Sequence, residues 1–363
     1  MSGQTGVRRL LSGCGCCAPG FSATGLELGR RSFLTGGIAA VAATTLGAPT
    51  VLAQAQPAAA KVRVDVHHHF LPPQHREALT KHKMGAPRWS PAMSIEDMDK
   101  SGIAVSMLSQ VQPGAWFGDV AESRRLSREI NDYGAKLVQD HPGRFGLFAT
   151  ISLPDVEGSL KEIEYVFDTL KADGLGLLTS YDGKYLGDPS FAPIYKELNR
   201  RKAVIYVHPL TPKCCDGAVP GIPPGSIEYA TDTTRTIAHL VFSGTATKYP
   251  DIRWIFSHSG GTLPFLTARF VRQQIVQKHA HLPNGPMPEF AKFYYELAQG
   301  NTRGQLAALL QMVPTSQLLY GTDFPYRDGA EVNKGIADWG FNATELRSIE
   351  RETAAKLLPR IKV

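Results

Sequence analysis

Short apolar segments of strand length alternate with longer amphipathic segments along most of this chain. Apolar runs of about four to eight residues predict buried strands, and apolar residues spaced three or four apart predict helices. Strands joined through helices run parallel, and eight such units favour a closed (β/α)8 TIM barrel over an open, doubly wound sheet. The eight predicted strands cover residues 62–67, 103–109, 145–151, 174–179, 203–208, 252–258, 293–297 and 317–321.

The connections between these strands are mostly helical in pattern. Two of them, residues 70–93 and residues 209–230, are long, and the second is rich in proline and glycine. No Gly-x-Gly-x-x-Gly sequence follows the first strand, which removes the main reason to expect a dinucleotide-binding fold. Amphipathic helices are predicted over residues 120–140, 156–172, 191–201, 231–244, 263–279 and 303–312.

The beginning of the chain has the features of an export signal. Arg30 and Arg31 lie in the sequence Gly-Arg-Arg-Ser-Phe-Leu, an uncharged stretch covers residues 35–52, and Ala53 and Ala55 suit a signal peptidase. The alternative is a transmembrane anchor, but glycine, alanine and threonine make the stretch only weakly hydrophobic. We therefore expect a twin-arginine signal that is cleaved near Ala53 or Ala55.

Removal of residues 1–55 would leave one domain over residues 56–363, which we expect to be periplasmic or otherwise exported. The removed segment holds four arginines and one glutamate, so the formal charge falls from +6 to about +3. That charge predicts neither a nucleic-acid partner nor membrane association after cleavage. The cysteines left are Cys214 and Cys215, which we expect to be free thiols, with a labile vicinal disulfide as the alternative.

The first predicted strand runs into three consecutive histidines, His67, His68 and His69. Alternate side chains of a strand point to the same face, so His67 and His69 can present two imidazole nitrogens to one metal ion. His68 should point the opposite way. A histidine pair on a strand can also be packed or solvated, so the pair by itself does not decide between a metal role and a structural one.

Further residues of the kind that bind metals follow other predicted strands. His208 closes the fifth strand, His258 closes the sixth, and Asp323 follows the eighth. The carboxyl ends of the strands of a barrel meet at one mouth, so these side chains should converge with the histidine pair. Any one of them could be a hydrogen-bonded core residue, but such residues at four strand ends favour a common site.

Four motifs resemble the amidohydrolase-related metalloenzymes typified by aminocarboxymuconate-semialdehyde decarboxylase. They are Asp-Val-His-His-His at the first strand, Val-His-Pro at His208, Ser-His-Ser-Gly-Gly at His258 and Tyr-Gly-Thr-Asp-Phe-Pro at Asp323. The resemblance runs from about residue 62 to the end of the chain, and residues 93–99 and 293–298 also look like relatives that decarboxylate salicylate-type acids. The family contains non-oxidative decarboxylases, lactone hydrolases and a hydratase.

The resemblance implies a barrel of the metal-dependent hydrolase type with His67, His69, His208 and Asp323 as ligands of one divalent metal, zinc. His258 is then the catalytic histidine, and no organic cofactor is expected. The chemistry agrees, because three imidazoles and a carboxylate suit zinc. The branch of the superfamily with two metals uses a lysine or carboxylate after the fourth strand, and residues 174–180 contain neither.

The resemblance also suggests substrate contacts and a homodimer. Arg269 lies eleven residues after His258, a spacing that in the decarboxylase places an arginine across the dimer interface at the substrate carboxylate. A surface or interface ion pair is the alternative role for Arg269. Arg88 matches a second family arginine only loosely. Glu296 could orient the catalytic histidine, line the pocket or support the structure.

These features predict a zinc-dependent, non-oxidative decarboxylase of a small aromatic or unsaturated carboxylic acid. His258 or Asp323 would supply the proton, and the sequence leaves that choice open. The alternative is a hydrolase of a lactone, ester or amide, with His258 as general base at the same site. A metal-binding protein without catalysis is a third reading, but it gives no role to His258.

Overall fold

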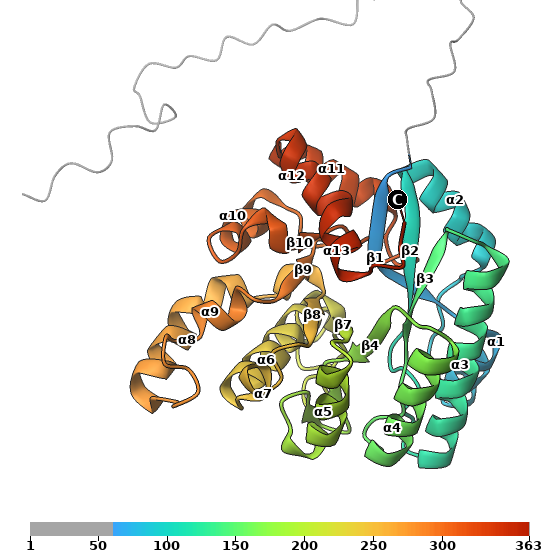
Figure 1. The fold of residues 1–363 in the computed structure, drawn as a ribbon, viewed down its shortest axis with the longest axis horizontal. Helices are drawn as coiled ribbons and strands as arrows, with labels where there is room; N and C mark the ends of the chain where they lie inside the picture. Colours follow the sequence, from blue (N-terminus) through green and yellow to red (C-terminus); the bar gives the residue numbers. More distant parts are fainter. Residues whose placement is uncertain (1–60, 363) are drawn as a thin grey trace, which may run out of the picture. The chain divides into compact units, whose positions relative to one another are not determined.

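Eight parallel strands form the central sheet of the computed structural model, which describes residues 61–362 (Figure 1). They pair in the order β1-β2-β3-β4-β7-β8-β9-β10, so the predicted (β/α)8 barrel is confirmed. The signal sequence predicted over residues 1–55 lies outside the described residues. The strands are β1 (Arg63–Phe70), β2 (Ile103–Gln110), β3 (Phe145–Ala149), β4 (Gly174–Leu178), β7 (Val204–His208), β8 (Arg253–Phe256), β9 (Tyr294–Glu296) and β10 (Leu318–Leu319).

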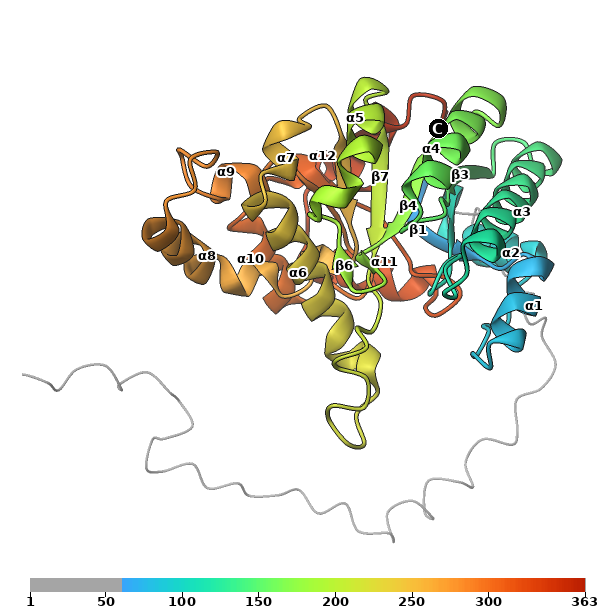
Figure 2. The ribbon, with the colours of Figure 1, turned by 90° about the horizontal axis from the view of Figure 1, so that it is seen from below.

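Helices connect these strands and surround the sheet (Figures 1 and 2). Within residues 61–362, no helix is both long enough and apolar enough to cross a membrane. A short antiparallel ribbon of β5 (Ser180–Tyr181) and β6 (Lys184–Tyr185) follows β4. The α-helices are α1 (Pro73–Lys81), α2 (Pro91–Ser101), α3 (Val120–Asp140), α4 (Val156–Glu164), α5 (Ala192–Arg200), α6 (Glu228–Phe242), α7 (Thr245–Lys248), α8 (Leu263–Gln277), α9 (Met287–Phe290), α10 (Arg303–Leu310), α11 (Gly329–Trp339), α12 (Ala343–Arg347) and α13 (Thr353–Leu357).

The strands are buried on both faces, which explains why they appear in the sequence as apolar runs without alternation. One face packs against the surrounding helices, and the other fills the barrel. The interior cluster also includes Ala354 and Leu358, at the end of the chain, which therefore help to fill the barrel away from the histidines. The strand residues of this interior cluster are Val64, Val66, Met107, Phe148, Val204, Tyr206, Ile255 and Leu319.

The barrel closes where the segment after β10 meets β1. The backbone N–H of Val66 donates to the carbonyl of Tyr320 at 3.0 Å, and the N–H of Asp323 donates to the carbonyl of His67 at 2.8 Å. The buried carboxylate of Asp65 accepts hydrogen bonds from the backbone N–H and the hydroxyl of Thr322, at 3.0 and 2.8 Å. Closure of the barrel therefore places Asp323 directly beside the histidines of β1.

The structure differs from the sequence prediction mainly at the ends of elements. β1 extends to Phe70, so His67 and His69 lie within the strand. His258 does not close β8 but begins a short 3-10 turn, and it has a left-handed φ of 55°. Helix α1 lies in the stretch read as a long connection, because its mostly polar residues give a weak apolar periodicity. The helix predicted over 156–172 ends at Glu164 and continues as a π-helical turn.

Gly321 lies at the point of closest approach between the closing segment and the rest of the barrel. A Cβ atom at this position would overlap Oε2 of Glu296 and lie 2.9 Å from Cβ of His67. Both neighbours are fully buried and cannot move aside freely. We therefore expect Gly321→Ala to lower the free energy of unfolding by about 1–3 kcal/mol, the usual range for overpacking. Urea unfolding followed by circular dichroism measures this change.

Gly304 provides the matched control, because no atom lies within 4 Å of a Cβ added there. It lies in the first turn of α10, so Gly304→Ala should be neutral or slightly stabilising. Equal unfolding free energies for the two variants would contradict the close packing described at Gly321.

Candidate metal centre

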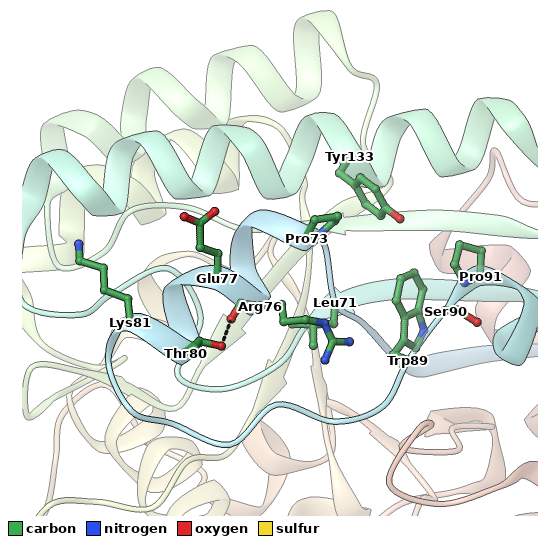
Figure 3. A pocket seen from close by; sticks show the side chains of 10 residues that line it. All are labelled: Leu71, Pro73, Arg76, Glu77, Thr80, Lys81, Trp89, Ser90, Pro91 and Tyr133. Carbon is green, nitrogen blue, oxygen red and sulfur yellow. Dashed lines mark hydrogen bonds between the residues drawn. The ribbon is translucent and has the colours of Figure 1, made fainter.

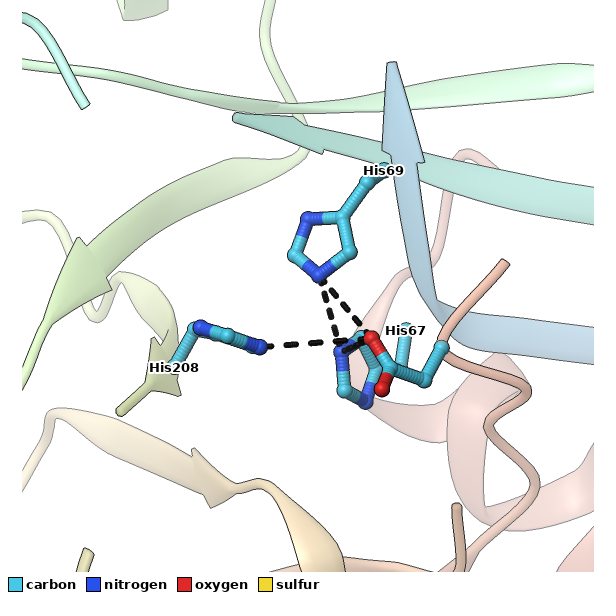
Figure 4. Close-up of side chains that lie close together, drawn as sticks. His67, His69 and His208 are labelled. Atoms are coloured by element: carbon cyan, nitrogen blue, oxygen red, sulfur yellow. Dashed lines mark hydrogen bonds and ion pairs between the residues drawn. The ribbon is translucent and has the colours of Figure 1, made fainter. Parts of the chain in front are cut away.

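Four predicted ligands come together at the carboxyl ends of the barrel strands (Figure 4). One ligand atom from each of His67, His69, His208 and Asp323 lies within 4.8 Å of the others, and all four residues are buried. Oδ1 of Asp323 lies 3.0, 3.2 and 4.0 Å from Nε2 of His67, His69 and His208. The two Nε2 atoms of His67 and His69 face each other at 3.1 Å.

Each of the three imidazoles is held through its other ring nitrogen. Nδ1 of His69 lies 2.9 Å from the carbonyl oxygen of Gln110, and Nδ1 of His208 lies 2.7 Å from that of Pro209. Carbonyl oxygens only accept hydrogen bonds, so these Nδ1 atoms carry the protons and the Nε2 lone pairs point into the cluster. Nδ1 of His67 lies 2.9 Å from Oε1 of Glu296.

The charges of the cluster call for a cation at its centre. Oδ1 of Asp323 is buried and accepts no hydrogen bond from the described residues. Burial disfavours the imidazolium of His67, but the carboxylates of Glu296 and Asp323 outweigh burial and raise the pKa of His67 to about 10. Burial lowers the pKa of His69 and holds that of His208 well below its usual value. These donors fit one divalent metal ion, which would take the place of the proton between the carboxylates.

His258 lies beside the ligand cluster. Its Nε2 lies 3.6 Å from Oδ2 of Asp323, and its ring centre lies 5.1 Å from that of His67. Both ring nitrogens are buried, and neither has a hydrogen-bond partner among the described residues. Unlike the three imidazoles above, this ring has no hydrogen-bond partner within residues 61–362 that fixes its tautomer.

Glu296 joins the ligand cluster to His258. Its Oε1 contacts Nδ1 of His67 and also accepts the backbone N–H of His258 at 2.6 Å. Its Oε2 accepts the N–H of Ala298 at 2.6 Å, so both carboxylate oxygens are used. Glu296 is fully buried and does not line the cavity described below. Of the three roles considered for it, the geometry supports orientation of the histidines.

His68 points away from the cluster, as expected from its place on the strand. Its Nδ1 lies 3.0 Å from Oδ2 of Asp65, and its Nε2 lies 2.8 Å from the hydroxyl oxygen of Ser94. The indole N–H of Trp89 donates to the same hydroxyl at 2.9 Å. His68 therefore supports the back of β1, on the side opposite to His67 and His69.

A cavity of about 420 Å³ opens over the cluster. His208 and Asp323 form part of its lining, and the remaining polar lining residues were not predicted from the sequence. Apart from Tyr229, which lies in the first turn of α6, they lie on loops and short turns outside any periodic pattern, and Tyr326 and Arg327 directly follow the recognised Asp-Phe-Pro motif. These additional polar residues are Gln112, Ser226, Tyr229, Gln299, Tyr326 and Arg327.

The two arginines expected to contact substrate do not line this cavity. Arg269 is exposed on α8, where it lines a surface groove, and Arg88 is exposed on the loop before α2. The larger groove of about 720 Å³ in Figure 3 also lies apart from the ligand cluster, and Trp89 and Tyr133 line it. None of its lining residues belongs to the ligand cluster.

Comparison with known proteins shows which family this chain belongs to. The amidohydrolase family model matches residues 64–360. The chain is 34% identical over 325 residues to decarboxylase macB of Penicillium terrestre, covering 83% of this chain and 96% of that protein. It is 32% identical over 314 residues to the 6-methylsalicylic acid decarboxylase of Penicillium expansum, covering 83% and 97%.

The fold also matches solved structures. A dihydroxybenzoic acid decarboxylase from Polaromonas sp., solved with bound manganese and the inhibitor 2-nitroresorcinol, superposes with a TM-score of 0.73. That match has 19% sequence identity and covers 84% of this chain and 98% of the other, so it supports the fold alone. From the family match and the two relatives above 30% identity, this chain belongs to the amidohydrolase family.

Proposed function

We propose that this chain is a metal-dependent, non-oxidative decarboxylase of a small aromatic carboxylic acid. The observation that carries the proposal is the buried cluster of three histidines and Asp323 beneath a cavity of about 420 Å³. Relatives that share about a third of its residues over most of their length are named decarboxylases, one of them for 6-methylsalicylic acid. A planar aromatic acid is the class of substrate that the name 6-methylsalicylic acid decarboxylase indicates.

For the metal we propose zinc, with manganese as the alternative. Three imidazole nitrogens and one carboxylate are typical zinc ligands, whereas manganese favours more oxygen ligands. A divalent ion at this site would supply Lewis acidity, drawing electron density from the oxygen atoms of the bound acid. His67, His69, His208 and Asp323 would hold it, and Glu296 with the carbonyls of Gln110 and Pro209 would fix the imidazole orientations.

The proton that the reaction needs is assigned to His258. Decarboxylation without oxidation adds a proton to the ring carbon that bears the carboxylate, and the carbon–carboxylate bond then breaks. The electron pair of that bond restores the aromatic ring as carbon dioxide leaves. Asp323 uses Oδ1 toward the ligand cluster and accepts the side-chain N–H of Gln299 at Oδ2, so it is poorly placed to give a proton. Among the described residues, the ring nitrogens of His258 have no such hydrogen-bond partners.

A hydrolase built on the same residues remains the second candidate. His258 would then remove a proton from a water molecule that attacks a lactone, ester or amide carbonyl. The favoured and alternative reactions differ in their products. Incubation with 6-methylsalicylate should release carbon dioxide and 3-methylphenol, and a chelator should abolish this release until Zn²⁺ is restored. Cleavage of lactones with incorporation of solvent oxygen, without carbon dioxide from the acid, would contradict the proposal.

His258→Ala separates proton transfer from metal binding. We expect carbon dioxide release to fall by about 100-fold or more, because general acid catalysis typically contributes that much. Metal content measured by atomic emission should stay near one ion per chain, since the four ligands are unchanged. His141→Ala, at a half-buried histidine after α3, serves as the control and should keep full activity. Loss of the metal from the His258 variant would contradict this division of roles.

We also propose that the protein is a homodimer through α8. This helix of 15 residues buries only Leu263, while Phe265, Ile275 and Val276 are 60%, 58% and 63% exposed. A second copy of the chain would cover these side chains. Arg269 lies on the same helix outside its own cavity, so a role at the substrate would require the partner subunit. Export through a signal in residues 1–55 is a further proposal from the sequence.

Sedimentation velocity tests the dimer. The unchanged protein should sediment as a dimer, and Ile275→Glu combined with Val276→Glu should shift it to monomer by placing charges in the apolar contact. Val120→Glu, at another exposed apolar residue, is the control and should leave the dimer intact. If the unchanged protein sedimented as a monomer, the dimer proposal would be contradicted. A contact between Arg269 and the substrate would then also be excluded.

A further inference from the structure

Of the described residues that line the cavity over the ligand cluster, one has a permanent positive charge. This residue is Arg327, and the remaining lining residues are neutral apart from the ligands His208 and Asp323. A carboxylic acid that enters this cavity brings a negative charge that must be compensated once water is displaced. Among the residues that line the cavity, a guanidinium matches the planar, two-oxygen geometry of a carboxylate best.

The backbone fixes Arg327 relative to the ligand cluster. The carbonyl of Asp323 accepts the backbone N–H of Tyr326 at 2.9 Å and that of Arg327 at 3.2 Å. These two bonds make a single turn that starts at the ligand Asp323 and ends at Arg327. The same turn places the ring of Tyr326 against His69, with ring centres 5.7 Å apart. Any shift of Asp323 would therefore also move Arg327.

Within the part of the chain that the structure describes, the guanidinium of Arg327 has only one ionic neighbour, and that neighbour is weakly placed. Its Nε lies 3.6 Å from Oε2 of Glu331, beyond hydrogen-bond distance, and both side chains are about half exposed. An exposed pair of this kind contributes little and exchanges readily with another anion. The neighbouring Asp328 is already used, because it accepts the backbone N–H of Glu331 at the start of α11.

We propose that Arg327 binds the carboxylate of the acid substrate, so that the anchor comes from the same subunit as the metal ligands. The inference rests on the proposed function and adds the residue that distinguishes the acid from its decarboxylated product. The rings of Tyr326 and Tyr229 stand by His69 and His208, with ring centres 5.7 and 6.1 Å apart, and give the cavity aromatic walls. A flat ring between these walls could point its carboxylate toward Arg327.

Calorimetric titration of two ligands that differ by one carboxylate tests the assignment. The ligands are 6-methylsalicylate and 3-methylphenol, and the Zn²⁺-loaded protein carries His258→Gln to slow turnover of the acid. Adding Arg327→Gln should weaken binding of the acid about tenfold or more and leave binding of the phenol unchanged. Arg327→Lys should recover part of the loss, because it keeps the charge without the paired donors.

Arg125→Gln is the matched control. Arg125 is 56% exposed and pairs with a glutamate four residues later, as Arg327 does, but it lies on α3 away from the cavity. The protein that carries Arg125→Gln should bind both ligands as tightly as the His258→Gln parent does. Unchanged binding of the acid by Arg327→Gln, or equal weakening of acid and phenol, would overturn the assignment, as would a parent that binds no acid.

Two further measurements distinguish the role of Arg327 from the dimer proposal and from the proposed decarboxylase function. If Arg269 of a partner were the sole anchor, Arg269→Gln would weaken binding of the acid and Arg327→Gln would not, which would overturn the role of Arg327. If the acid bound through Arg327 but the unsubstituted protein released no carbon dioxide, the proposed function would fail and the assignment of Arg327 would stand.

Discussion

The hydrogen bond from the backbone N–H of Asp323 to the carbonyl of His67 organises both the fold and the candidate site. It joins the segment after the last strand to the first strand, and so closes the barrel. The same bond brings the carboxylate of Asp323 within 3.0 Å of Nε2 of His67. Asp65 reinforces this junction through Thr322, from a carboxylate that is fully buried. The contact that closes the barrel therefore also assembles the ligand cluster.

Glu296 positions two histidines of the candidate site, His67 and His258. One oxygen of this carboxylate contacts the ring of the ligand His67 and the backbone of His258. The left-handed backbone at His258 and Ser259 turns the chain sharply at this point, which brings the His258 ring over the cluster instead of along the strand. The candidate metal ligand His67 and the proposed proton donor His258 are therefore positioned by a common buried charge.

Much of the fold, and the residues that come together in the candidate ligand cluster, could be predicted from the sequence because both depend on local patterns. Buried parallel strands appear as apolar runs, and the ligands His67, His69 and His208 stand at or near the ends of such runs. The lining residues Tyr229 and Arg327 could not be found this way. Tyr229 lies in the first turn of α6 and Arg327 on the loop after β10, and their place at the mouth follows from contacts between distant segments and from no periodic pattern.

The position of the ligands along the chain has a consequence for biosynthesis. His67 comes from the first strand and Asp323 from the segment after the last, so an incomplete chain holds the histidine pair without its carboxylate partner. If the proposed metal site is correct, such a chain would bind a divalent ion more weakly, since it would lack both the charge of Asp323 and the closed barrel that orients the imidazoles. Tight metal binding at the proposed site would then mark a domain in which the segment after β10 has been synthesised and has paired with β1.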